Sequence, residues 1–499
     1  MGLIFKYLNL EIVIMFQWFT YAWNYTILFT GLSRCYNEYQ TGQIQLNELV
    51  DILIPKIAKC GSVAIKFCQW IAPKMELILI DEEQFYESTY EKPRWLKKLE
   101  VFLEDCPEHE LSYTLRQYED IFGETLTDKY HIIHTLGSGS IGQVYLIKDK
   151  ETGAKHVLKI QHPDIDYQIS YFEVMYSVVS RLPKFHYIFL QIPFNIHDFI
   201  DSFREQSDFV REANNLLRMK DIYKDNDKVQ IPELISVSKT ILIMDYLEGK
   251  SFDDLDMSET QKIKAYALFY LFTRNNILIE NFNHGDLHQG NWKVTKDLQL
   301  IVYDFGFCWS IPRDKSSMIE KSLNTFEGTC LENISKQLSA ICDLMYDLLI
   351  HDSFSDKTQL KQDITDHVDN SEMVNPDNRG IVTSPISTIK LLNSFITKYP
   401  ERNIKINSHL IQFLIIFIQI QKNCMRYGYA SSEGYNYPST RIFKERYMDS
   451  LNICQTYNIF PKYAKYIEDK LKGLNLKRTS IFDSINFPDN LRELAISNS

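Results

Sequence analysis

The apolar positions change their period along the chain, and each change predicts a different kind of element. From 43 to about 117 they recur at helical spacing, as in Leu46, Leu49 and Leu53, which predicts several helices separated by polar breaks. Shorter runs rich in β-branched and aromatic residues follow at 130–134, 145–147 and 156–160. Their length and the turn residues between them predict three strands.

From residue 196 onward the chain is predicted to be mostly helical, with three further strands. The spacing predicts a helix over 196–219, two strands within 229–247 and an apolar strand over 298–303. A later apolar helix, 408–425, is interrupted by glutamines, which favours a place in the core of a helical domain over a membrane span. These elements together predict an α+β fold.

Residues 12–33 carry no formal charge and are rich in large apolar and aromatic side chains. About 20 mostly apolar residues are enough to span a bilayer. Gln17, Asn24 and the dense aromatic residues fit an interfacial or a buried helix equally well. Three interpretations therefore stay open here: a membrane span, a helix lying at the membrane surface, and a buried helix.

Composition narrows the function classes. The 499 residues suggest two or three domains, and the hydrophobic content of 45% is that of a folded protein. A net charge of −11 without a basic stripe argues against a nucleic-acid-binding protein. The nine cysteines form no C-x-x-C pair, which indicates a reducing, intracellular environment, and the twelve histidines show no zinc-site spacing.

The strongest chemical signal lies between His284 and Gly306. Phosphoryl transfer needs a carboxylate to orient the attacking hydroxyl and two oxygen-bearing groups to hold magnesium. Asp286, in His-Gly-Asp, is the candidate catalytic base. Asn291 follows it, and Asp304 opens an Asp-Phe-Gly triplet after the strand, so these two are the candidate Mg²⁺ ligands.

A glycine-rich hairpin precedes this segment. In protein kinases, backbone amides of such a hairpin face the nucleotide phosphates. A strand follows the glycines here, whereas a dinucleotide-binding motif needs a helix. The candidate ATP-binding residues of the hairpin are Leu136, Gly137, Ser138, Gly139, Ser140, Gly142 and Val144.

Lys159, on the third predicted strand, is placed to reach the α and β phosphates of ATP. That lysine needs an acidic partner on a helix, and Glu212, within 196–219, is the candidate. Met244 and Tyr246 lie in the segment expected to form the hinge that meets the adenine.

These motifs resemble those of the UbiB-type atypical kinases, also called aarF-domain kinases. The matching residues are Lys66 and Gln69 of a K-x-x-Q motif, Gln161-His162-Pro163, Asp208, Glu212 and the loop from His284 to Asn291. The resemblance implies a bilobal protein kinase-like fold with a helical extension over 1–110, a nucleotide-binding lobe over 111–247 and a helical lobe over 248–499.

The resemblance also implies ATP and Mg²⁺ as cofactors, and a membrane-associated kinase or ATPase tied to isoprenoid and coenzyme Q metabolism. A membrane lipid or isoprenoid is then the expected partner beside the nucleotide. In that family the K-x-G-Q lysine and an E-x-D acid fold the extension over the active site, so Lys66, Gln69 and Asp208 are regulatory candidates. This chain departs at Cys68 and Gln206, which replace the family's glycine and glutamate, and at the hairpin glycines, where the family usually has alanines.

Two other functions stay open at this point. The loop from His284 to Asn291 also resembles small-molecule phosphotransferases of the aminoglycoside and choline kinase type, although these lack the Lys66 motif. A non-enzymatic nucleotide-binding scaffold is the other alternative. No A-P-E motif follows Gly306, which makes protein substrates less favoured. The phosphate acceptor and any protein partner are not identified by the sequence.

Overall fold

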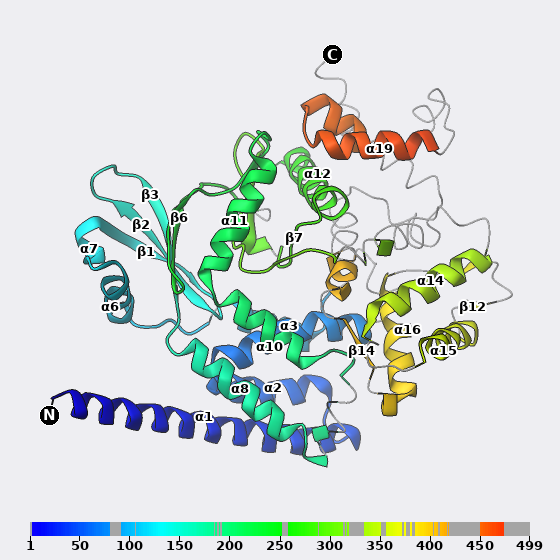
Figure 1. Cartoon of the computed structure of the whole chain (residues 1–499), viewed down its shortest axis with the longest axis horizontal. Coiled ribbons are helices and arrows are strands. Elements are labelled where there is room, and N and C mark those ends of the chain that lie inside the picture. The colour runs from blue at the N-terminus through cyan, green and yellow to red at the C-terminus, as the bar shows by residue number, and fades with distance from the viewer. Residues whose placement is uncertain are drawn as a thin grey trace. The chain divides into compact units, whose positions relative to one another are not determined.

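A computed structural model gives the fold of the chain (Figure 1). It describes residues 2 to 473 except 80–90, 105, 184, 187–188, 190–191, 252–257, 288, 313–314, 316, 319–333, 351–355, 372–373, 376–379, 382–384, 403, 408–409, 417 and 419–449.

The chain divides into two compact units. Unit 1 consists of Met1–Leu79, Glu91–Ala213 and Glu233–Tyr246, and unit 2 of Ile80–Tyr90, Asn214–Pro232 and Leu247–Ser499. The helical extension and the predicted nucleotide-binding strands therefore share one unit. The chain leaves unit 1 for the last time after Tyr246, within the predicted hinge segment.

The centre of unit 1 is a five-stranded antiparallel sheet in the order β1-β2-β3-β6-β5 (Figure 1). Its strands are β1 (Tyr130–Ser138), β2 (Gly142–Asp149), β3 (Lys155–Gln161), β5 (Leu234–Val237) and β6 (Ile241–Asp245). The strands predicted at 130–134, 145–147 and 156–160 are confirmed. Ile147, Leu158 and Ile243 are buried on one face of the sheet, where they pack with Tyr118 of a flanking helix.

Helices make up most of the rest of the described part of unit 1. They are α1 (Gly2–Gln40), α2 (Leu46–Lys59), α3 (Ser62–Leu79), α5 (Arg94–Glu104), α6 (Leu111–Phe122), α7 (Leu126–Lys129), α8 (Ile165–Val179), α10 (Ile196–Gln206) and the start of α11 (Phe209–Tyr223). An aromatic cluster joins α1, α3, α8 and α10, with Tyr25, Tyr171, Phe172 and Phe199 in contact.

The apolar segment 12–33 lies within α1. Tyr25 is buried in the aromatic cluster, whereas Phe19 and Trp23 are exposed. In the part of the chain that the structure describes, no helix has the length and apolar character needed to cross a membrane. One face of α1 is therefore packed against the protein around Tyr25, and the face that carries Phe19 and Trp23 is exposed.

The helix predicted over 196–219 is wrong in one respect, because it is two helices. α10 ends at Gln206 and α11 begins at Phe209. The Asp208 carboxylate accepts a hydrogen bond from the Val210 amide at 3.0 Å, and this side-chain cap favours a new helix start over continuation.

Unit 2 combines helices with short strands. A three-stranded sheet has the order β4-β9-β8 and contains the predicted 298–303 strand as β9. The elements are β4 (Val229–Gln230), α12 (Glu259–Asn275), β7 (Asn283–His284), β8 (Trp292–Val294), β9 (Leu300–Val302), β10 (Cys308–Trp309), α14 (Ile334–Leu348), β11 (Leu349–Ile350), α15 (Lys357–Asp369), β12 (Val374–Asn375), β13 (Gly380–Ile381), α16 (Pro385–Lys398), β14 (Lys405–Ile406) and α19 (Pro461–Gly473).

The packing of α1 can be tested with two aromatic residues of that helix. Tyr25→Ala should lower the free energy of unfolding by about 3–5 kcal/mol, because it leaves a cavity in the aromatic cluster. Trp23→Ala, at a side chain that is 60% exposed, should change it by less than about 0.5 kcal/mol. Urea denaturation measures both, and equal effects would contradict the one-sided packing of α1.

Candidate functional site

The glycine-rich hairpin joins β1 to β2. The Gly139 amide donates to the Gly142 carbonyl at 3.0 Å and closes the turn. A Cβ at Gly142 would stand 2.5 Å from the carbonyl oxygen of Ile160, so this position has no room for a side chain. A Cβ at Gly137 would meet nothing within 4 Å. The close approach of β3 thus requires a glycine at position 142, whereas packing does not require one at position 137.

The strand register brings Val144 of the hairpin and Lys159 together. Val144 pairs with Lys159 across β2 and β3, so the two side chains share a face of the sheet. The Lys159 ammonium donates to both carboxylate oxygens of Glu212 at 2.8 Å. Both side chains are nearly inaccessible, with exposed fractions of 11% and 2%. The lysine–glutamate pair predicted from the sequence is therefore present in unit 1.

The hinge candidates Met244 and Tyr246 lie at the end of β6. Met244 is buried and pairs with Val157 of β3, and the Tyr246 amide donates to the Lys155 carbonyl at 3.1 Å. These contacts place both residues beside the strand that carries Lys159.

The extension reaches the hairpin through Gln69. The Ser140 hydroxyl donates to the side-chain oxygen of Gln69 on α3 at 3.2 Å, and Ser140 is buried. Lys66 and Asp208 are both described, and the structure has no ion pair between them. Gln206 is buried and donates to the Ser202 hydroxyl at 3.0 Å. The Gln69–Ser140 contact between α3 and the hairpin is therefore a neutral hydrogen bond.

Lys74, one residue that sequence reasoning missed, is buried on the same helix. Its ammonium donates to the Trp70 carbonyl at 2.8 Å and lies 4.1 Å from the centre of the Trp70 ring. Burial, and next the positive charge of Lys66, lower the pKa of Lys74 to about 7.

In unit 2, the predicted catalytic loop is organised by His284. One ring nitrogen, Nε2, donates to the Tyr303 carbonyl at 2.9 Å, and the other accepts from the Asp286 amide at 3.2 Å. Burial lowers the pKa of His284, although the neighbouring Asp304 and Asp286 charges act in the opposite direction. A neutral His284 satisfies both bonds and ties the backbone of Asp286 to the strand that leads into Asp304.

Asn291 and Asp304 have the chemistry of Mg²⁺ ligands. The Asn291 amide nitrogen donates to the Asp286 carbonyl at 2.8 Å, which orients the side-chain oxygen in the opposite direction. Asp304 has a φ of 53°, in the left-handed region, and its carboxylate accepts from the Gly306 amide at 3.2 Å. A carboxylate and an amide oxygen suit Mg²⁺, which takes few protein ligands when nucleotide phosphates supply the others. Among the described residues, no group of three or more His, Cys, Asp and Glu side chains is arranged so that it could hold a metal ion.

Gln412 and Asn215, which sequence reasoning also missed, brace this loop. Gln412 donates to the Gly285 carbonyl at 2.9 Å, and Asn215 donates to the Phe305 carbonyl at 3.0 Å. Gly285 itself lies against the Phe307 ring, where a Cβ would come within 2.4 Å. The available signal was the glutamine within the apolar helix predicted over 408–425, since a polar residue on a buried face needs a partner.

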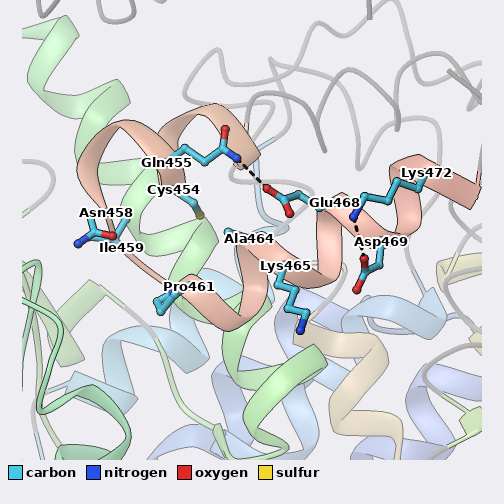
Figure 2. A pocket seen from close by; sticks show the side chains of 10 residues that line it. All are labelled: Cys454, Gln455, Asn458, Ile459, Pro461, Ala464, Lys465, Glu468, Asp469 and Lys472. Carbon is cyan, nitrogen blue, oxygen red and sulfur yellow. Dashed lines mark hydrogen bonds and ion pairs between the residues drawn. The ribbon is translucent and has the colours of Figure 1, made fainter. Parts of the chain in front are cut away.

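A pocket of about 290 Å³ lies between α19 and the preceding helical segment, 450–457, with the turn that joins them (Figure 2). Its lining combines apolar and polar side chains, and the polar ones form a Gln455–Glu468 hydrogen bond at 2.8 Å and a Lys472–Asp469 ion pair at 3.3 Å. None of the residues proposed from the sequence lines it.

The buried ion pair can be compared with an exposed one in the same segment. Glu212→Ala should lower the free energy of unfolding by about 3–5 kcal/mol, because it leaves the Lys159 charge buried without its partner. Glu205→Ala breaks an exposed pair with Arg211 and should cost less than about 1 kcal/mol. Thermal or urea unfolding of the two variants measures the difference. Similar losses of unfolding free energy would contradict the expectation that the buried ion pair is the more costly one to break.

Comparison with known proteins identifies the domain. Residues 103–333 match the ABC1 atypical kinase-like domain. The probable serine/threonine-protein kinase abkC of Dictyostelium discoideum is 27% identical over 250 residues, which cover 48% of this chain and 34% of that protein. A probable protein kinase UbiB of Photobacterium profundum is 26% identical over 208 residues, covering 38% of this chain and 37% of that protein.

The chain thus spans about a third of the length of these curated relatives. A solved structure, the complex of a Mycobacterium tuberculosis protein with erythromycin, covers 66% of this chain and 88% of its own at 16% identity, with a TM-score of 0.38. The resemblance stated from the motifs is confirmed by the family match and by the curated relatives. The chain contains an ABC1 atypical kinase-like domain and is a homologue of the UbiB and aarF-domain kinases.

Proposed function

We propose that this protein binds Mg²⁺ and ATP and transfers the terminal phosphoryl group to a hydroxyl or to water. The observation that carries the proposal is the buried Lys159–Glu212 ion pair at 2.8 Å, beside a glycine hairpin, in a chain with an ABC1 kinase-like domain. A buried ion pair costs desolvation free energy, so its presence favours a functional role over a purely stabilising one.

Each proposed residue has a distinct role in this reaction. Lys159, held by Glu212, contacts the α and β phosphates, and the amides of the hairpin face the phosphate chain. Asp304 and Asn291 would hold the magnesium ion, which supplies positive charge against the charge that develops on the phosphates. Asp286 accepts a hydrogen bond from the attacking hydroxyl or water and takes its proton.

The proposed acceptor is a small molecule or lipid. By resemblance to the UbiB family, an isoprenoid-related compound of coenzyme Q metabolism is the favoured class. The sequence after Gly306 lacks the A-P-E motif that helps protein kinases bind a peptide, and this supports a non-protein acceptor.

The extension is proposed to regulate the hairpin. Gln69 accepts a hydrogen bond from Ser140, so α3 holds the hairpin in one position. Lys66, one helical turn earlier, is proposed to assist by its charge, and Asp208 by fixing the start of α11. Neither role requires a direct Lys66–Asp208 contact.

Nucleotide binding is tested by thermal unfolding of the full chain. Mg²⁺ and ATP at a hundred times the dissociation constant should stabilise the protein by about 2.7 kcal/mol, a shift of a few degrees. Asp304→Asn should lose the magnesium-dependent part of this shift. Asp297→Asn, at an exposed turn of the same unit, should keep it. No shift in the unmodified protein would contradict the proposed function.

Regulation by the extension is tested by removing the Gln69 contact. Gln69→Ala should raise the rate of ATP turnover by roughly threefold to tenfold, as expected for the loss of one hydrogen bond that restrains the hairpin. Gln43→Ala, at an exposed position of the extension, is the matched control. Turnover unchanged in both Gln69→Ala and Lys66→Ala would rule out this regulation.

A further inference from the structure

One residue holds two carbonyl groups of the glycine-rich hairpin. His162, just after β3, places ring nitrogen Nε2 at 2.9 Å from the Gly139 carbonyl oxygen. Its backbone amide donates to the Ile141 carbonyl at 2.8 Å. The carbonyls on both sides of Ser140 are therefore bonded to His162, which is itself buried.

The hydrogen-bond partners determine which ring nitrogens carry protons. The Gly139 carbonyl can only accept, so His162 Nε2 carries the hydrogen, and the Nδ1 of a neutral ring accepts. His109 Nδ1 lies 2.8 Å from that atom and is the donor. His109 Nε2 then accepts from the Thr114 hydroxyl at 2.8 Å, and Thr114 accepts from Tyr145 at 3.0 Å. The result is one directed chain of bonds that ends on the hairpin.

The electrostatic environment keeps this chain neutral. Burial, and next the proximity of His162, lower the pKa of His109 to about 4, and burial lowers the pKa of His162. A second proton on either ring would replace an acceptor with a donor and break one bond of the chain. At neutral pH both rings therefore have the protonation that the geometry requires.

The neighbouring Gln161 connects the same point to the helix that carries Glu212. Its side-chain nitrogen donates to the Ser207 carbonyl at 2.7 Å, and its amide donates to the Thr240 carbonyl at 2.9 Å. The two residues at the end of β3 thus join the hairpin to the segment directly before α11. Gln161 and His162 of the Gln-His-Pro motif therefore connect the hairpin to the neighbouring segments.

We propose that His162, oriented by His109, is a positioning residue that keeps the hairpin carbonyls turned toward itself and thereby sets the affinity of the hairpin for phosphate. Glycine peptides flip at low steric cost, and a flip would turn a carbonyl oxygen to where an amide stood. A carbonyl oxygen repels phosphate, whereas an amide binds it. The part that concerns phosphate rests on the proposed nucleotide function.

The experiment compares His162→Phe with His162→Gln in the full-length protein. The phenylalanine keeps the ring shape and removes the Nε2 donor, whereas a glutamine amide can replace that donor. Calorimetry should show Mg²⁺-ATP bound about fivefold to tenfold more weakly by His162→Phe, as expected for one lost hydrogen bond, with adenosine binding unchanged. His162→Gln should restore most of the affinity for Mg²⁺-ATP.

Amide hydrogen exchange of the ligand-free protein tests the positioning without any nucleotide. Amides 139–142 should exchange faster in His162→Phe and in His109→Phe, which removes the orienting partner. The β2–β3 turn, 149–154, is the internal control and should not change. His109→Phe also decides the question if His162→Phe does not fold.

The outcomes separate the two proposals. If amides 139–142 exchange in the folded His162→Phe and His109→Phe variants at the same rate as in the unmodified protein, the role of His162 is overturned. Equal losses of Mg²⁺-ATP and adenosine affinity overturn its link to phosphate. If the unmodified protein binds no Mg²⁺-ATP, the proposed function is rejected. If the hairpin amides nevertheless exchange faster in His162→Phe, the positioning role of His162 stands.

Discussion

The buried ion pair between Lys159 and Glu212 is the constraint on which unit 1 depends. Two charges withdrawn from water lose hydration free energy, and a bidentate contact at 2.8 Å is what makes their burial tolerable. Lys159 must therefore stand on a central strand, where β2 and β6 pair on both sides. Glu212 must stand in the first turn of α11, which Asp208 caps. The ion pair therefore holds the sheet and the first turn of α11 next to each other.

The extension takes part in the same packing. Ile141 of the hairpin packs against the aromatic cluster that Tyr25, Phe172 and Phe199 help to form. The Gln69–Ser140 bond and the bond from the Cys106 amide to the Ser138 carbonyl, at 3.1 Å, add polar contacts between the extension and the hairpin. Changes in the extension are thus transmitted to the hairpin by direct contact, and removing α1 would expose part of the core that supports it.

The sequence predicted those parts of the molecule that depend on local patterns. Three strands, the glycine hairpin and the Lys159–Glu212 pair follow from period, turn residues and motif order. The break at Asp208 was missed because apolar spacing continues across it, and only the cap reveals it. His109 and Gln412 were missed for a different reason, since their partners lie far away along the chain. The burial of Tyr25 likewise depends on α8, a partner that no local pattern identifies.

The two units hold their reactive groups in one common way. In unit 1 the hairpin is restrained by neutral imidazoles, and in unit 2 a neutral His284 bonds the backbones of Asp286 and Tyr303. A neutral ring fixes geometry without adding charge where phosphate or a cation would bind. Under the proposed function, the charges that act on the nucleotide and the magnesium ion are supplied by Lys159, Asp286 and Asp304. Because the supporting bonds are already made, binding has little conformational freedom left to remove at these points, which is the physical meaning of a preorganised site.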